Sequence, residues 1–216
     1  MILDEYLLNL PKIGEGSYGE VYLTSKKNSK EIYATKKVEK QKIISDKLRQ
    51  YFLNEIEILK NINHPNIMQL VDIQSRHNYI YLITEYCNGG TLSDNLTMYQ
   101  KLHKNPLPEK IVIYLMKQIA DAIFYLHEKS IINRDLKMEN ILLHFENLDD
   151  RKKLNLLKAK VKIIDFGFAR YLNDNSHSPS IVGSPYNMAP DILHALADPS
   201  WHKNLKYNQK ADIYSI

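Results

Sequence analysis

The sequence contains only one cysteine, Cys87, and only seven glycines. A single cysteine excludes a disulfide within the chain and is typical of proteins from reducing compartments, so we expect a cytoplasmic location. Scarce glycines are more often found where the backbone requires them, which makes their positions informative. Long apolar runs are also missing. The longest, at 111–116, is far shorter than the roughly 20 residues of a membrane-spanning helix, so no transmembrane segment is expected.

Concentrated positive charge is absent too. The net charge is +4, and the lysines and arginines are spread along the chain, whereas nucleic-acid-binding proteins usually gather them in one patch. We therefore expect no nucleic-acid partner. The first ten residues lack the basic start and apolar core of a signal peptide. The remaining composition, 44% hydrophobic and 25% charged, is that of a globular protein. The length suffices for one large domain or two small lobes.

The first part of the chain is predicted to be rich in β-strands. Residues 10–38 indicate three strands, separated by a glycine-containing turn and by a polar turn at 27–30. An apolar stripe with helical periodicity follows, and two further strands are expected at 67–73 and 79–85. The stripe consists of Ile44, Leu48, Phe52, Ile56 and Leu59.

The second part is predicted to be mainly helical. Residues 88–90, Asn-Gly-Gly, are interpreted as a flexible joint between the two parts. Thr91 is suited to cap a short helix, and a longer helix is expected to begin near Pro108. Short strands are expected at 141–143 and 161–164. The apolar face of the longer helix comprises Ile111, Leu115, Ile119, Ile123 and Leu126.

A glycine-rich motif, GEGSYGEV, begins at Gly14 and continues through Gly16 and Gly19. Glycines at this spacing let backbone amides approach phosphate groups without obstruction by side chains. A hairpin turn that merely contains glycines is the alternative, and the motif alone does not exclude it. A dinucleotide-binding motif is rejected, because it needs a helix that starts among the glycines, whereas a β-type segment follows here.

Two charged residues after this motif are candidates for phosphate binding. Lys36 stands in a predicted strand, where it could place an ammonium group on phosphate oxygens. Glu55 stands on the predicted helix, where it could form an ion pair that holds this lysine in place. Each residue alone is usually a solvated surface charge. Lys36 lies 22 residues after Gly14, which leaves room for two strands and a turn back over the same ligand. Glu55 is favoured by its spacing from Lys36, which is the one that the family resemblance described below implies.

A second polar motif, INRDLKMENILL, occupies residues 132–143. Asp135 could accept the proton of an attacking hydroxyl group, and Lys137 could neutralise a transferring phosphoryl group. Asn140 offers a neutral oxygen to a hard cation such as Mg²⁺. Asp165, which follows a predicted strand and precedes Phe-Gly, is a further candidate Mg²⁺ ligand. A polar turn without function is the alternative for each motif taken alone.

The order and spacing of these motifs together resemble the eukaryotic protein kinase domain, from about residue 6 to the end of the chain. The resemblance implies a bilobal α+β fold. A β-rich N-lobe at 1–87 would bind ATP, and an α-rich C-lobe at 88–216 would carry the catalytic loop, the Mg²⁺ site and the activation segment. It also implies ATP and Mg²⁺ as cofactors and a protein with serine or threonine hydroxyls as the substrate.

The resemblance further implies a role for each matching residue. In it Asp135 is the catalytic base, Asn140 and Asp165 hold Mg²⁺, Thr84 is the gatekeeper, and Lys36 pairs with Glu55. The catalytic group comprises Asp135, Lys137, Lys36 and Glu55. The nucleotide-binding group comprises Ile13, Gly14, Gly16, Gly19, Val21, Ala34, Lys36, Thr84, Glu85, Cys87 and Leu142, of which Glu85 and Cys87 would form hinge hydrogen bonds to adenine.

Finer features indicate the subfamily. Lys137, two residues after the base, and Ser184 are typical of serine/threonine kinases rather than tyrosine kinases. The segments 85–90, 165–172 and 183–185 resemble the autophagy-initiating kinases, which also carry extra residues where 146–160 stand here. Arg134 before the base implies control by phosphorylation of the activation loop. The candidate sites are Ser180 first and then Ser176 and Ser178, and an unmodified loop is the alternative.

Several departures from the kinase pattern stand out. Asn133 replaces the usual His, so we expect a looser active conformation with the chemistry retained. Met138 replaces a common Pro, and Asp191 replaces the Glu of Ala-Pro-Glu. Residues 210–216 resemble the start of the central C-lobe helix, so the C-lobe would be truncated there and this chain alone poorly stable. A non-catalytic, nucleotide-binding scaffold is therefore kept as the alternative to an active kinase.

Overall fold

The computed structural model describes residues 2–3, 5–8, 11–16, 19–172, 181–198, 200 and 208–216. The chain divides into two compact units. The first unit comprises Met1–Asn63 and Met68–Asn88, and the second comprises His64–Ile67 and Gly89–Ile216. Within the described residues, no helix is both long enough and apolar enough to span a membrane.

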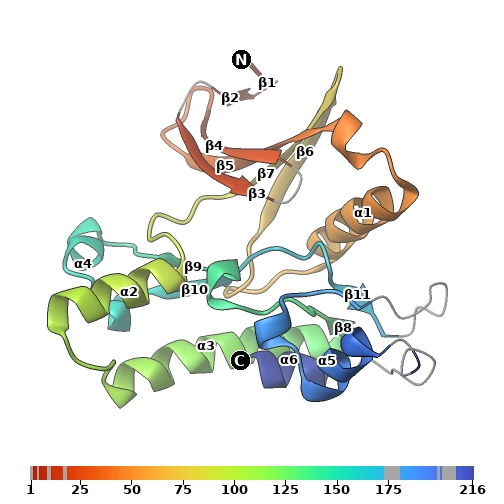
Figure 1. Ribbon diagram of the computed structural model, residues 1–216. Helices are drawn as coiled ribbons and strands as arrows, with labels where there is room; N and C mark the ends of the chain where they lie inside the picture. Colours follow the sequence, from red (N-terminus) through yellow and green to blue (C-terminus); the bar gives the residue numbers. More distant parts are fainter. Residues whose placement is uncertain are drawn as a thin grey trace. The chain divides into compact units, whose positions relative to one another are not determined.

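The first unit is an antiparallel sheet with one helix (Figure 1). The strands follow the order β1-β2-β4-β5-β7-β6, and β3 pairs with the other part of β4. The predicted polar turn lies between β4 and β5, as expected. The strands are β1 (Ile2–Leu3), β2 (Tyr6–Leu7), β3 (Lys12–Gly16), β4 (Gly19–Lys26), β5 (Ile32–Glu39), β6 (Leu70–Arg76) and β7 (Tyr79–Glu85).

Both faces of strand β7 are buried, because its alternating side chains enter two apolar clusters. On one face Leu82 packs with Val38 of β5 and with Phe52 of helix α1 (Asp46–Asn61). On the other face Tyr81 and Ile83 pack with Tyr6 of β2. The run of large apolar residues from Tyr79 to Ile83 is typical of a strand covered on both sides.

The predicted apolar stripe of α1 is only partly buried. Phe52 and Leu59 are buried, whereas Ile44 is 75% exposed and Leu48 is 38% exposed. The helix begins only at Asp46, after the short 3-10 helix η1 (Lys40–Ile43), so Ile44 lies outside it. Ser45 caps the first turn by accepting a hydrogen bond from the Leu48 N–H. The buried face therefore starts one turn later than the periodicity predicted.

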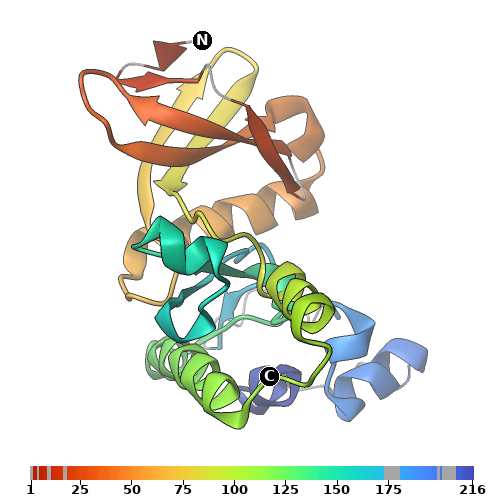
Figure 2. The same cartoon turned by 90° about the vertical axis from the view of Figure 1, so that its left-hand side faces the viewer.

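The second unit contains five α-helices in its described part, together with two short strand pairs (Figure 2). Strand β9 pairs with β10, and β8 pairs with β11, each in antiparallel register. The helices are α2 (Leu92–His103), α3 (Glu109–Glu128), α4 (Leu148–Lys152), α5 (Pro190–Ala197) and α6 (Lys210–Ser215). The strands are β8 (Ile131–Ile132), β9 (Ile141–His144), β10 (Lys160–Ile163) and β11 (Arg170–Tyr171), and the 3-10 helices are η2 (Met138–Asn140), η3 (Leu156–Lys158) and η4 (Pro185–Asn187).

Helix α3 carries the core of the second unit. Its five predicted core residues, from Ile111 to Leu126, are all buried. Strands β8 and β10 and the 3-10 helix η3 pack against α3. The large apolar residues of α3 that stay exposed are Val112, Ile113 and Phe124.

The glycines at 89 and 90 do not form a loose joint. The Gly89 N–H donates to the Leu143 carbonyl at 2.8 Å, and the Leu143 N–H donates to the Gly90 carbonyl at 2.9 Å. A Cβ atom at Gly89 would lie 2.5 Å from the Leu143 oxygen, which is too close for any side chain. Gly90 has a φ of +75°, a conformation that favours glycine. Close backbone packing therefore requires glycine at 89, and the backbone conformation favours glycine at 90.

Candidate active site

The glycine motif forms the hairpin between β3 and β4, in which Gly14 pairs with Val21 and Gly16 pairs with Gly19. A Cβ atom at Gly19 would lie 2.0 Å from the Lys37 carbonyl oxygen, so the neighbouring strand β5 requires a glycine there. A Cβ atom at Gly14 would meet only the Val21 Cβ, at 3.9 Å. The fold thus requires glycine at position 19, whereas a larger residue would fit at position 14 without a steric clash.

Lys36 and Glu55 form an ion pair within the first unit. Lys36 Nζ lies 3.1 Å from Glu55 Oε1, and their side chains are 17% and 5% exposed. Strand β5 supplies the lysine and helix α1 supplies the glutamate. A Cβ atom at Gly16 would approach the Lys36 Cε to 3.2 Å, so the absence of a side chain there leaves room for the lysine. The two residues proposed from their spacing are therefore brought together.

The other nucleotide-binding candidates of the first unit lie on neighbouring strands. Ala34 of β5 stands opposite Thr84 of β7, and the Thr84 hydroxyl donates to the Ala34 carbonyl at 3.4 Å. The Glu85 carboxylate accepts the Gln69 N–H at 2.7 Å, so this side chain joins the end of β7 to the residue before β6. Cys87 is buried, and Ile13 is 43% exposed. The remaining candidates are Val21, half-buried in β4, and Leu142, half-buried in β9 of the second unit.

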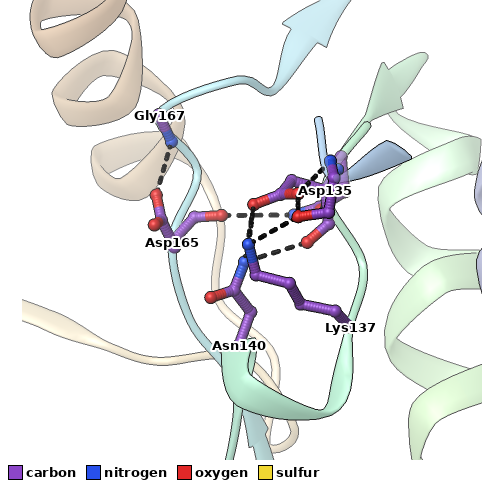
Figure 3. Close-up of polar contacts among 7 residues, drawn as sticks. Asp135, Lys137, Asn140, Asp165 and Gly167 are labelled. Carbon is purple, nitrogen blue, oxygen red and sulfur yellow. Dashed lines mark hydrogen bonds and ion pairs between the residues drawn. The ribbon is translucent and has the colours of Figure 1, made fainter. Parts of the chain in front are cut away.

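Asp135 is the centre of a polar network in the second unit (Figure 3). One carboxylate oxygen, Oδ2, accepts a charge-assisted hydrogen bond from Lys137 Nζ at 2.8 Å and another from Asn140 Nδ2 at 3.0 Å. The other oxygen, Oδ1, accepts both the N–H and the hydroxyl of Ser184, at 2.9 and 2.8 Å. Lys137 also donates to the Ser184 hydroxyl oxygen at 2.8 Å. This network fixes the orientation of the carboxylate.

Asp165 follows strand β10 in a left-handed backbone conformation, with a φ of +63°. Its Oδ1 atom accepts the Gly167 N–H at 3.1 Å (Figure 3). Such a conformation is costly for a residue with a side chain and is found mainly where the surroundings hold it. Arg134, just before Asp135, is also left-handed, with a φ of +69°.

Asn140 and Asp165 are the residues of the second unit that could hold a magnesium ion. Each offers an oxygen, which is the donor type that Mg²⁺ prefers. Within the described residues, no group of three or more His, Cys, Asp or Glu could hold a metal ion by itself. Mg²⁺ is usually held by one or two protein side chains together with phosphate oxygens and water, and these two residues suit such an ion.

The loop that carries Asp135 is fixed to helix α6 by Asp212, which is fully buried. The Asp212 carboxylate accepts the backbone N–H groups of Asn133 and Arg134, each at 2.9 Å. His127 of α3 lies 2.9 Å from the same carboxylate. Arg134 Nε donates to the Phe168 carbonyl at 2.6 Å, which ties the loop to the segment after Asp165.

Two positioning residues were not predicted from the sequence. His127 was not connected with Asp212, because the two are 85 residues apart and no pattern links them. Gln118 of α3 was also missed. Its side chain bonds to Asn66 and to the backbone of Val161 and Ala159. The only sequence signal for Gln118 is that it is a polar residue on the otherwise apolar face of α3. The predicted phosphorylation sites Ser176, Ser178 and Ser180 lie outside the described residues.

Residues 8–216 match the protein kinase domain. The chain belongs to the protein kinase family. It is 38% identical over 99% of its length to the serine/threonine-protein kinase ULK3 of Xenopus laevis, and 36% identical over 99% to the serine/threonine-protein kinase ATG1a of Arabidopsis thaliana. It is also 36% identical over 98% of its length to calcium-dependent protein kinase 5 of Plasmodium falciparum.

These matches confirm the α+β kinase fold and the resemblance to serine/threonine kinases of the autophagy-initiating type. Members of this family generally use ATP and Mg²⁺. The chain spans only 40% of the ULK3 sequence, 30% of the ATG1a sequence and 33% of the calcium-dependent kinase sequence. The relatives therefore contain large segments that have no counterpart in these 216 residues.

Proposed function

We propose that this chain is an ATP- and Mg²⁺-dependent protein kinase that transfers the γ-phosphoryl group to serine or threonine hydroxyls. The observation that carries the proposal is the Asp135 carboxylate, held by Lys137, Asn140 and Ser184 at 2.8–3.0 Å. A buried carboxylate aimed in this way suits a base that orients and deprotonates an attacking hydroxyl group. A polar turn without function would not need so many bonds to one side chain.

Each residue has a defined part in the proposed reaction. The oxygen of the substrate hydroxyl attacks the γ-phosphorus, and Asp135 accepts the proton of that hydroxyl. The bond between the γ-phosphorus and the oxygen of the β-phosphate breaks, and ADP leaves. Lys137 sits beside that carboxylate, where its charge stabilises negative charge that develops on the transferring group. Lys36, held by Glu55, binds the α- and β-phosphates. Asn140 and Asp165 would hold Mg²⁺, which would neutralise phosphate charge.

The remaining sequence assignments form part of the same proposal. Residues 1–87 would act as the nucleotide-binding lobe and 88–216 as the lobe that binds the protein substrate. The adenine would contact Ile13, Val21, Ala34, Thr84, Glu85, Cys87 and Leu142, and the phosphates would lie against Gly14, Gly16 and Gly19. A cytoplasmic location and a place in autophagy-related signalling are proposed from the single cysteine and from the subfamily resemblance, respectively.

The test is phosphate transfer from labelled ATP to a general protein acceptor. We expect the unmodified chain to be active, and Asp135→Asn to lower the rate about 10²-fold or more, as for other general bases. The matched control is Glu139→Gln, an exposed acid in the same loop, which should stay within about twofold of the unmodified rate. Activity unchanged by Asp135→Asn would overturn the assigned base. An inactive chain that still binds MgATP would favour the scaffold alternative.

A further inference from the structure

Asn133 stands where kinases usually carry His, and its side chain and its backbone N–H form hydrogen bonds in the catalytic region. The residue is 1% exposed. Its side-chain oxygen accepts the Asp135 N–H at 3.1 Å, and its side-chain NH₂ group donates to the Asp165 carbonyl at 3.4 Å. Its backbone N–H donates to Asp212 at 2.9 Å. One carboxamide therefore joins the segment of the proposed base to that of the proposed metal ligand.

The bond to Asp165 acts on a backbone under strain. Asp165 has a φ of +63°, which a residue with a side chain adopts only when its surroundings hold it. Its carbonyl is the group that Asn133 holds. A rotation of the peptide after Asp165 would also move the Gly167 N–H, which the Asp165 carboxylate accepts at 3.1 Å. The direction of that carboxylate thus depends on the peptide that Asn133 restrains.

The bond to Asp135 acts on a second strained position. Between Asn133 and Asp135 lies Arg134, with a φ of +69°. The side-chain oxygen of Asn133 reaches over this residue to the Asp135 N–H, which is the local bond that Asn and Asp form in turns. An amide is uncharged and provides a donor and an acceptor at once. It can hold both segments without placing a charge beside either carboxylate.

We propose that Asn133 is a positioning residue that keeps the proposed base Asp135 and the proposed Mg²⁺ ligand Asp165 in a fixed mutual orientation. The inference rests on the proposed kinase function. It predicts that loss of the NH₂ donor toward Asp165 mainly weakens Mg²⁺ binding. Loss of the oxygen acceptor toward Asp135 mainly lowers the catalytic rate. The bond to Asp165, at 3.4 Å, is long for an N–H donor, so the metal side is the weaker end of the bridge.

Asn133→Asp separates the two ends, because Asp keeps the oxygen toward Asp135 and replaces the donor toward Asp165 by a second acceptor. Asn133→Ser tests the same point without a new charge. The shorter serine side chain cannot bridge both segments, and its hydroxyl is expected to keep the local bond to the Asp135 N–H and to lose the bond to Asp165. Asn133→Ala removes both bonds. The control is Asn147→Asp, because Asn147 caps α4 through its side-chain oxygen and Asp caps equally well.

Two readouts are measured for each variant: the Mg²⁺ concentration that gives half the maximal rate, and calorimetric binding of ADP with Mg²⁺ and with EDTA. We expect Asn133→Asp and Asn133→Ser to raise that Mg²⁺ concentration and weaken MgADP binding about fivefold, with metal-free ADP binding changed less than twofold. Asn133→Ala should in addition lower the maximal rate at saturating Mg²⁺. Asn147→Asp should change neither readout.

A lower melting temperature with both Mg²⁺ readouts within twofold of the unmodified chain would overturn the inference and leave Asn133 as a packing residue. If Asn133→Asp does not fold, Asn133→Ser decides by the same criteria. Failure of the proposed function is distinguishable, because it would appear as an unmodified chain without phosphate transfer. The comparison of MgADP with ADP binding would still test Asn133 in that case.

Discussion

The carboxylate of Asp212 accepts the backbone N–H of Arg134 at 2.9 Å, although the two residues are 78 positions apart in the chain. The same fully buried side chain accepts the Asn133 N–H and contacts His127. Buried backbone donors must be paired, and here the pairing comes from a helix rather than from a strand partner. The position of the loop that carries Asp135 therefore depends on α6.

Asp212→Asn tests this anchor. The amide NH₂ group would face a backbone or imidazole nitrogen where the carboxylate accepted a hydrogen bond. At least one buried donor is then left without an acceptor, which costs about 1–3 kcal/mol. We expect this loss in the free energy of unfolding, measured with urea, and a lower rate of phosphate transfer. Asp149→Asn, an exposed acid on α4, is the control. Equal stability of the two variants would contradict the proposed anchor.

The glycines of the β3–β4 hairpin are predicted to differ in their tolerance of a methyl group. Gly19→Ala would place its Cβ atom 2.0 Å from the Lys37 oxygen and would push strands β4 and β5 apart. We expect a loss of about 1–3 kcal/mol or more, as for overpacked cores. Gly14→Ala meets only the Val21 Cβ, so its folding stability should be nearly unchanged. Urea unfolding of both variants measures the difference. Similar losses of stability in both variants would show that the close contact with the Lys37 oxygen is not what makes Gly19 necessary.

Glu55 and Glu57 lie on the same helix but differ in burial. Glu55 is 3% exposed and paired with Lys36, whereas Glu57 is exposed. Glu55→Gln keeps the size of the side chain and removes the charge that holds the lysine. We expect kcat/KM for ATP to fall at least tenfold, which corresponds to about 1.4 kcal/mol. Glu57→Gln should leave it unchanged. A fall of equal size in both variants would point to a general effect of helix charge.

His64 of the second unit is predicted to make stability depend on pH. Burial lowers its pKa below the ordinary value of 6.5, Asp121 opposes this shift, and Lys162 adds to it. The ring also accepts the Asn66 N–H through Nδ1 at 3.1 Å and packs on Tyr125. The unfolded chain then takes up the proton at a higher pH than the folded chain does. Stability must therefore fall as the pH drops below about 6.5.

We expect the free energy of unfolding of the unmodified chain to decrease more between pH 7 and pH 5.5 than that of His64→Gln. The difference between the two chains isolates His64 from the other histidines. An NMR titration of the His64 ring gives a direct check. A midpoint at or above 6.5 would rule out the proposed burial effect.

Local patterns in the sequence predicted most of the fold. Strands β4, β5 and β7 and the apolar face of α3 follow from periodicity and turn residues, because each is defined by neighbours along the chain. The start of α1 was placed too early because Ile44 continues the helical period through a 3-10 segment. A pattern of side chains does not reveal where the backbone changes its hydrogen bonding.

The candidate site was predictable to the extent that its residues are close in sequence. Asp135, Lys137 and Asn140 share one short loop, and the bonds among these three form within it, whereas Ser184 joins them from 49 residues away. The anchors from His127 and Gln118 were not predictable, since single polar residues on a helix carry no periodic signal. Their partners become neighbours only after the chain has folded.

The second unit receives four residues, 64–67, from the first half of the chain. Asn66 accepts the Ile163 N–H at 2.8 Å and donates to the Val161 carbonyl at 3.0 Å. A fragment that begins at Gly89 would therefore lack a partner for each of these groups in β10. No single cut in the chain yields both units intact. Limited proteolysis after Asn88 should leave two fragments that stay associated through residues 64–67, and the fragment that begins at Gly89 should refold only when the other is added.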